Sequence, residues 1–163
     1  MNNKKRVLIY GFYGIENAGN EAMLRALCAP LTEHYGDNIE VVVAARHPSP
    51  DYDQRFGVRT IPNFEYTSRE DSMGRWLRGL NPDDSEEYLQ FINEVANADL
   101  VVLGPGQLLV ETGTSGMLKG ALGQTLAVVT ACQLTSTPLY GLALACEDLK
   151  SAWGRLTIRQ VLS

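Results

Sequence analysis

Hydrophobic residues along the chain alternate between short continuous runs and stretches with a helical repeat. The run from Val7 to Tyr10 is apolar throughout and ends at a glycine, which is typical of a strand buried on both faces of a parallel sheet. A loop is predicted from Gly11 to Gly19. From about Asn20 to Gly36 apolar residues recur at helical spacing, and Ile39 to Ala45 is rich in β-branched residues. The predicted order is strand, helix, strand.

The second half of the chain repeats this alternation. The pair Asn81-Pro82 predicts a helix start, because an asparagine cap followed by proline suits the first turn of a helix. Asp99 to Leu103 predicts a buried strand, Ala121 to Leu134 a largely buried helix, and Pro138 to Ala145 a last strand. Alternating strands and helices favour an α/β fold: a Rossmann-like open parallel sheet with helices on both faces.

Two segments are less regular. A polar loop is predicted to begin at Arg46, His47 and Pro48, and between Pro48 and Gly79 only a short stretch, Val58 to Ile61, favours a strand. The tail from Ser151 to Leu162 predicts a short amphipathic helix. The apolar residues expected on its inner face are Leu156, Ile158, Val161 and Leu162. Because 163 residues is the usual size of one domain, we predict a single domain over residues 1–163.

Composition and charge narrow the classes of function. With 45% hydrophobic and 20% charged residues, the chain has the composition of an ordinary globular protein. Fourteen Lys and Arg against nineteen Asp and Glu give a net charge of -5, which argues against a nucleic-acid partner. The run from Val7 to Tyr10 is too short for a signal peptide or a membrane span. We therefore expect no membrane span and a cytoplasmic location.

The cysteines and histidines give no metal motif. Cys28, Cys132 and Cys146 are widely spaced in apolar surroundings, so they predict buried thiols in a reducing compartment rather than disulfides or a zinc site. His34 and His47 have no second ligand at metal-binding spacing, which favours surface or capping roles. No metal site is expected.

Two glycine-bearing loops are the candidates for a ligand site. The first, Gly11 to Glu21, leads into a helix, whose free N–H groups suit an anionic or hydroxyl-rich ligand. Its spacing is not the dinucleotide fingerprint, and the same glycines would also suit a long turn that binds nothing. The second loop, Gly104 to Gly113, follows another strand. Because ligands of open α/β sheets bind outside the carboxyl ends of the strands, the two loops are predicted to share one edge.

Three segments resemble the polysaccharide pyruvyl transferases. Gly11 to Leu24 is similar to that family's opening motif, G-Y-Y-G-x-x-N-x-G-D-E-A-hydrophobic-L. Ala98 to Leu109 is similar to its segment D-hydrophobic-hydrophobic-x-G-G-G-x-L-L, and Pro138 to Arg159 to its segment P-x-x-x-x-G-x-x-x-G-P…R. The three segments fall in the family's order.

The resemblance implies a transferase with two Rossmann-like lobes and an architecture related to the GT-B glycosyltransferases. Such enzymes use phosphoenolpyruvate as donor, with no further cofactor, and leave a pyruvate ketal on a sugar of a cell-envelope polysaccharide. Members with both lobes are about twice as long, so residues 1–163 would be the N-terminal lobe. The partners implied are the small-molecule donor, the sugar acceptor, and a second lobe or partner chain.

The same resemblance implies a set of site residues. Glu21 would be the general acid or base, and Arg155 a contact for an anion, since an arginine fork binds carboxylate and phosphate bidentately. The cleft walls would be formed by Gly14, Asn17, Gly19, Asn20, Gly104, Gly106 and Gln107. Glu21 would equally suit the helix dipole as a first-turn carboxylate.

The chain departs from the family pattern at several positions. Asn20 stands where an aspartate is usual, and Pro105 replaces the middle glycine of the second motif, which removes a backbone donor. These departures keep open an alternative, a binding or assembly module that pairs with a second chain or with itself. A lobe of a GT-B glycosyltransferase that binds a nucleotide sugar is a further alternative, because it shares the architecture.

Overall fold

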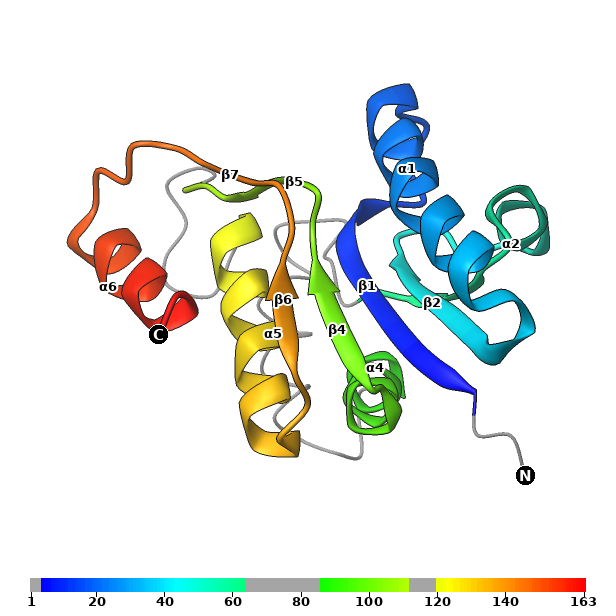
Figure 1. The fold of residues 1–163 in the computed structure, drawn as a ribbon. Coiled ribbons are helices and arrows are strands. Elements are labelled where there is room, and N and C mark those ends of the chain that lie inside the picture. Colours follow the sequence, from blue (N-terminus) through cyan, green and yellow to red (C-terminus); the bar gives the residue numbers. More distant parts are fainter. Residues whose placement is uncertain (1–3, 64–85, 112–119) are drawn as a thin grey trace.

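A five-stranded sheet forms the centre of the molecule. The structure, a computed structural model, describes residues 4–63, 86–111 and 120–163. The strand order is β3-β2-β1-β4-β6, and every neighbouring pair is parallel. The strands are β1 (Lys5–Tyr13), β2 (Ile39–Ala45), β3 (Arg59–Pro62), β4 (Leu100–Leu103) and β6 (Leu139–Gly141). Helices cover both faces (Figure 1), which confirms the predicted α/β, Rossmann-like architecture.

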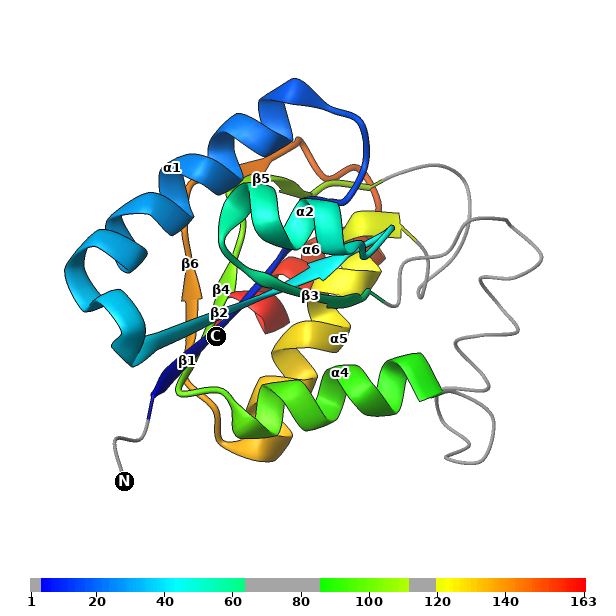
Figure 2. The same ribbon diagram turned by 90° about the vertical axis from the view of Figure 1, so that its right-hand side faces the viewer.

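The two faces of the sheet bury separate clusters of apolar side chains. Along β1, Val7 and Ile9 pack toward α1 (Ala18–Tyr35) and α2 (Pro50–Phe56). Leu8 and Tyr10 pack toward α4 (Glu86–Asn97) and α5 (Gly120–Thr135). Figure 2 shows α1 and α5 on opposite sides of the sheet. The continuous apolar run of the sequence is therefore explained, because both faces of this strand are covered.

The strand order reverses direction at one place. The chain proceeds from β1 outward through β2 and β3, then crosses to β4 and continues to β6 on the other side. The boundary between β1 and β4 is therefore the topological switch point, where open α/β sheets commonly bind ligands.

A smaller sheet extends the carboxyl edge. It pairs β5 (Gly106–Leu109) with β7 (Leu144–Cys146), and the chain ends in α6 (Ala152–Val161). The prediction of one strand over Pro138 to Ala145 was wrong, because the chain leaves the main sheet after Gly141. Ala143, with φ of 48°, turns the chain toward β5.

Several local predictions also need correction. Ser49 caps α2 with Pro50 at its first turn, a helix signal in a segment predicted as loop. Ile158 and Val161 pack inward as predicted, whereas Leu156 and Leu162 are 66% and 67% exposed. Cys146, predicted as buried, is exposed. The first strand continues to Tyr13, and α1 begins at Ala18. The helix start predicted at Asn81-Pro82 lies outside the described residues.

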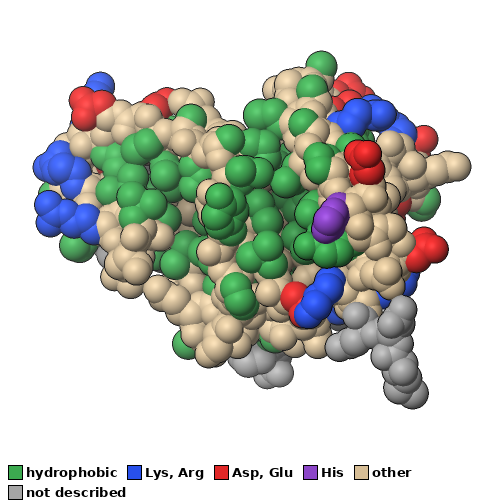
Figure 3. Space-filling view, viewed as in Figure 1, with side chains coloured by type: hydrophobic (Ala, Val, Ile, Leu, Met, Phe, Trp, Pro, Cys, Tyr) green, Lys and Arg blue, Asp and Glu red, His purple; other side chains and the backbone are tan. Residues whose placement is uncertain are grey.

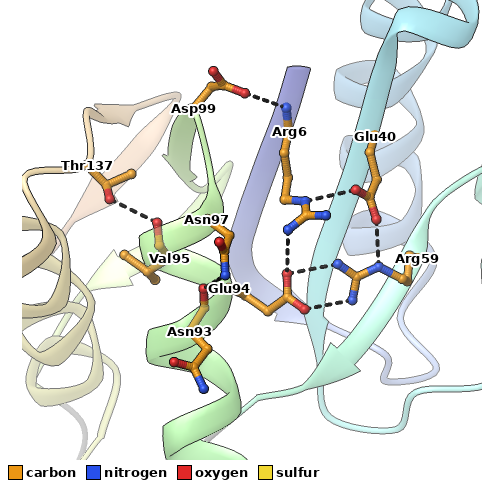
Figure 4. Close-up of polar contacts among 9 residues, drawn as sticks. All are labelled: Arg6, Glu40, Arg59, Asn93, Glu94, Val95, Asn97, Asp99 and Thr137. Carbon is orange, nitrogen blue, oxygen red and sulfur yellow. Dashed lines mark hydrogen bonds and ion pairs between the residues drawn. The ribbon is translucent and has the colours of Figure 1, made fainter. Parts of the chain in front are cut away.

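The amino edge of the sheet is held by ion pairs (Figure 4). The Arg59 guanidinium donates two hydrogen bonds to Glu94 of α4, at 2.9 and 2.8 Å, and its Nε donates to Glu40 at 2.8 Å. Arg6 Nε donates to the other oxygen of Glu40 at 2.8 Å. The four side chains link the first residues of β1, β2 and β3 to α4.

Candidate functional site

The two predicted loops meet at the carboxyl edge of the sheet. β1 and β4 are parallel neighbours with Tyr10 opposite Leu103, so the segments that follow them leave the sheet at the same edge. This is the switch point, and the sequence-based prediction that both loops share one edge is confirmed.

Gly14 is needed for close packing between neighbouring loops. Its φ is 71°, and a Cβ there would lie 2.8 Å from the Cβ of Ala45 and 2.9 Å from the backbone nitrogen of His47. The backbone N–H of Gly14 donates to the Tyr52 hydroxyl at 3.5 Å. The glycine therefore lets the loop after β1 lie directly on the loop after β2.

The Asn17 side chain binds the backbone N–H groups at the start of α1 that the sequence analysis proposed as ligand donors. Its side-chain oxygen accepts the backbone N–H groups of Gly19 at 3.0 Å and Asn20 at 3.2 Å, so it is the N-cap of α1. The N–H of Glu21 donates to the Asn17 carbonyl at 3.0 Å. A ligand that bound the N–H groups of Gly19 and Asn20 would have to displace this cap.

Glu21 forms an ion pair with a residue that the sequence analysis missed. Arg55, near the end of α2, donates from Nη2 to Glu21 Oε2 at 2.6 Å. The Arg55 guanidinium also lies 5.1 Å from the centre of the Phe56 ring. Arg55 lay in a segment predicted as loop, and the signal that would have placed it on a helix was the cap Ser49-Pro50. This pair joins the first turn of α1 to α2, and Glu21 must exchange this partner to act on a substrate.

Gly104 is held from three sides at the start of the second loop. Its N–H donates to the carbonyl of Tyr10 at 2.9 Å, and its carbonyl accepts the Tyr13 hydroxyl at 2.9 Å. Its φ is 94°, and a Cβ there would overlap the carbonyl oxygen of Leu142. Only glycine fits this position. The peptide bond from Gly104 to Pro105 is cis.

Gly106 and Gln107 belong to a strand rather than to a loop. Gly106 opens β5 opposite Leu144, and the Gln107 side chain donates to Glu147 Oε1 at 2.6 Å. The prediction of a loop from Gly104 to Gly113 was therefore wrong over β5, and residues 112–113 lie outside the described residues. Gln107 is exposed, so its amide remains accessible to a ligand.

Arg155 is not brought to the same place as Glu21. It lies on α6, which Figure 1 shows at the opposite end of the sheet from α1. Its Nη1 donates to the carbonyls of Leu149 at 3.1 Å and Lys150 at 2.7 Å. Glu111 accepts hydrogen bonds from the hydroxyl and the N–H of Ser151 and from the N–H of Lys150, which hold its pKa below the usual range. Arg155 therefore fixes the turn before α6.

Tyr13 is the central residue that the sequence analysis did not single out. Its side chain is 1% exposed and its hydroxyl bonds the carbonyl of Gly104 across the switch point. Burial raises the pKa of Tyr13 and raises that of the neighbouring Cys28 to about 12, so both groups stay protonated. The cluster beneath the loops is neutral. The motif spacing contains no signal for this long-range bond.

The described residues contain neither a metal-binding cluster nor a membrane-spanning helix. Within residues 4–63, 86–111 and 120–163, no group of three or more His, Cys, Asp or Glu side chains is arranged to hold a metal ion. Among the helices of those ranges, none has the length and apolar character needed to cross a bilayer.

Comparison of the chain with models of known protein families and with curated proteins finds no match. A function for the chain therefore rests on the geometry of the carboxyl edge and on the resemblance of its motifs.

Proposed function

We propose that residues 1–163 form the N-terminal lobe of a polysaccharide pyruvyl transferase-like enzyme. The observation that supports the proposal is the meeting of two motif-bearing loops at the switch point. They start from adjacent strands, and the bond from the Tyr13 hydroxyl to the Gly104 carbonyl, at 2.9 Å, joins them. Two segments that resemble one family at separate points of the sequence thus lie at the same edge of the sheet, where we take them to be the two walls of one ligand site.

The chemistry needs a proton donor and a counter-charge. The methylene carbon of phosphoenolpyruvate takes up a proton, and a sugar hydroxyl attacks the adjacent carbon and loses its proton. A second hydroxyl then closes the ketal as the bond to phosphate breaks, and its proton leaves with the phosphate. Glu21 is the carboxyl group that we assign to proton transfer. We assign the anion contact in this lobe to Arg55, since it lies 2.6 Å from Glu21, whereas Arg155 lies on α6.

The lobe supplies only part of a catalytic site. A second lobe or a partner chain would close the cleft over the donor and the sugar acceptor. We therefore expect the chain alone to bind phosphoenolpyruvate weakly without turnover. We also propose a cytoplasmic location, because Cys28, Cys132 and Cys146 are free thiols, which suit a reducing compartment.

Calorimetric titration with phosphoenolpyruvate and, separately, with a uridine diphosphate sugar tests the proposal. We expect phosphoenolpyruvate to bind, Arg55→Gln to weaken its binding about tenfold through loss of a charged contact, and the matched control Arg159→Gln to leave it unchanged. Binding of the nucleotide sugar alone would instead identify a glycosyltransferase lobe. Absence of both would contradict the proposal. Release of phosphate from phosphoenolpyruvate at an enzymatic rate, by this chain alone with an acceptor sugar, would contradict the proposal that the lobe supplies only part of a catalytic site.

An assembly module is the second candidate, and one surface favours it. Figure 3 shows hydrophobic side chains gathered over β4 and β6. Tyr140 of β6 is 59% exposed and Leu134 at the end of α5 is 79% exposed. Exposed apolar surface of this kind marks interaction sites. Light scattering that shows a monomer at millimolar concentration would argue against self-assembly, and concentration-dependent dimers would support it.

A further inference from the structure

The strands β1 and β4 separate at the switch point. Their ladder pairs Val7 with Leu100 through Tyr10 with Leu103 and then stops. β1 continues beside β2, with a register shift between Tyr10 and Tyr13. The last backbone bond across the gap runs from the N–H of Gly104 to the carbonyl of Tyr10, at 2.9 Å. Beyond it, no further backbone pair between these two strands fixes how far apart the loops lie in the described residues.

The Tyr13 side chain bridges the place where the ladder ends. Its hydroxyl donates to the Gly104 carbonyl at 2.9 Å. Both the N–H and the carbonyl of Gly104 are therefore hydrogen-bonded to residues of β1. On the other side, the Leu142 carbonyl leaves no room for a side chain at Gly104. Gly104 is therefore fixed between a side chain of the first motif and the backbone that follows β6.

The direction of the Tyr13 ring follows from its packing. A Cβ at Gly11 would lie 2.7 Å from the Cε2 atom of the ring, so the ring lies on the bare backbone of Gly11. The ring is buried in the same apolar cluster as Cys28 and Tyr52. Because the ring has no freedom to turn away, its hydroxyl is aimed at the second loop. A phenylalanine would fill the same space without a buried hydroxyl to satisfy.

We propose that Tyr13 is a positioning residue that sets the spacing between the two loops of the candidate site, acting through Gly104 and not by touching the ligand. This inference rests on the proposed function, because it takes the two loops to be the walls of one ligand site. Burial raises the pKa of Tyr13, so the hydroxyl remains a donor over the pH range of ordinary binding experiments.

The test compares Tyr13→Phe with Tyr10→Phe. Tyr10 is a matched control, since it is a buried tyrosine of the same strand whose hydroxyl donates to Gln124 Oε1 at 3.4 Å. Amide hydrogen exchange by NMR reports on Gly104, and titration with phosphoenolpyruvate reports on the site. We expect Tyr13→Phe to speed exchange at Gly104 and to raise the dissociation constant of phosphoenolpyruvate, each about tenfold. Tyr10→Phe should change the exchange rate at Gly104 and the dissociation constant less than twofold each, although its loss of thermal stability should be similar to that of Tyr13→Phe.

The outcomes separate this inference from the proposed function. Unchanged exchange at Gly104 in Tyr13→Phe would overturn the inference, and so would faster exchange with unchanged affinity. If the wild-type chain does not bind phosphoenolpyruvate, the proposed function fails, and Tyr13 is then no positioning residue for that ligand even if exchange at Gly104 responds. Should Tyr13→Phe fail to fold, the hydroxyl proton of Tyr13 in the wild-type chain decides: a slowly exchanging resonance supports the bond, and rapid exchange with water overturns it.

Discussion

The two edges of the same sheet are held together by different chemistry. At the amino edge, Arg6, Glu40, Arg59 and Glu94 form an ion-pair network across three strands and a helix. At the carboxyl edge, alongside the ion pair of Glu21 with Arg55, neutral hydrogen bonds and close backbone contacts at Gly14 and Gly104 hold the loops in place. Long charged side chains span distances and tolerate small shifts, whereas at Gly14 and Gly104 the neighbouring backbone lies too close for any added side chain.

The difference indicates a division of roles. At the amino edge the arginine and glutamate side chains are paired with one another, so we assign this edge to stabilising the fold. The carboxyl edge places loops, a helix start and backbone groups where a ligand would lie, as expected for the binding edge of an open α/β sheet. Changes at the amino edge should therefore alter stability without altering binding, and changes at the carboxyl edge should alter both.

The largest effect is expected at Gly104. In Gly104→Ala the methyl group would overlap the Leu142 carbonyl, and φ of 94° disfavours any side chain. We expect the free energy of unfolding to fall by about 3 kcal/mol, measured by urea denaturation. Gly57→Ala is the control, since its φ of 65° is also positive but no atom lies within 4 Å, and it should cost about 1 kcal/mol. Equal losses would show that Gly104 is not constrained by its neighbours.

The amino edge is probed by Glu94→Gln. This variant removes the charge that receives two hydrogen bonds from Arg59. We expect a loss of about 2 kcal/mol in urea denaturation and an unchanged affinity for phosphoenolpyruvate. Lys5→Met, which breaks an exposed pair with Asp99, should cost clearly less than Glu94→Gln, because solvent screens an exposed ion pair. A tenfold loss of affinity in Glu94→Gln would contradict the division between the edges.

Acid should weaken the amino edge through Glu40. Burial alone would raise the pKa of this carboxyl group, but hydrogen bonds from Arg59 and Arg6 lower it below its ordinary value of 4.5. A carboxyl group whose pKa is lower in the folded state stabilises the fold above its unfolded pKa, and that contribution is lost as pH falls through the folded pKa. Stability should therefore drop below about pH 4.5, and Glu40→Gln should flatten the drop. An unchanged profile, measured by denaturation at several pH values, would exclude Glu40 as the cause.

The smallest effect is expected at Arg155. Its guanidinium bonds two backbone carbonyls at an exposed turn, so Arg155→Ala should cost about 0.5 kcal/mol by thermal denaturation. The Arg155→Ala variant should bind phosphoenolpyruvate with unchanged affinity, because α6 lies away from α1 (Figure 1). Strong loss of binding would return Arg155 to the site implied by the motif resemblance.

The fold was largely predictable because each major element carries its own periodic signal. The strand Ile39–Ala45 was predicted with its observed bounds, and the helix of α5 was predicted to within a residue at either end. The division of the last predicted strand into β6 and β7 could not be predicted, because the turn at Ala143 lies inside a continuous apolar run. A run of apolar residues does not reveal where a chain changes from one sheet to another.

The candidate site was predictable in place but not in contacts. Glycine loops after two buried strands sufficed to place both loops at one edge. The cap by Asn17, the pair of Glu21 with Arg55, and the bond of Tyr13 to Gly104 each depend on how a side chain lies in the folded chain. Glu21 and Arg55 are 34 positions apart and Tyr13 and Gly104 are 91 apart, so no local pattern connects them.

The most direct test of the central claim is an NMR titration of the isotope-labelled chain with phosphoenolpyruvate. The account predicts that the amide resonances that shift belong to the segments that follow β1 and β4, from Gly14 to Glu21 and from Gly104 to Gln107. The amides beside Arg6, Glu40 and Arg59 should remain still. Shifts confined to the amino edge, or none at saturating ligand, would contradict the assignment of the carboxyl edge as the binding site.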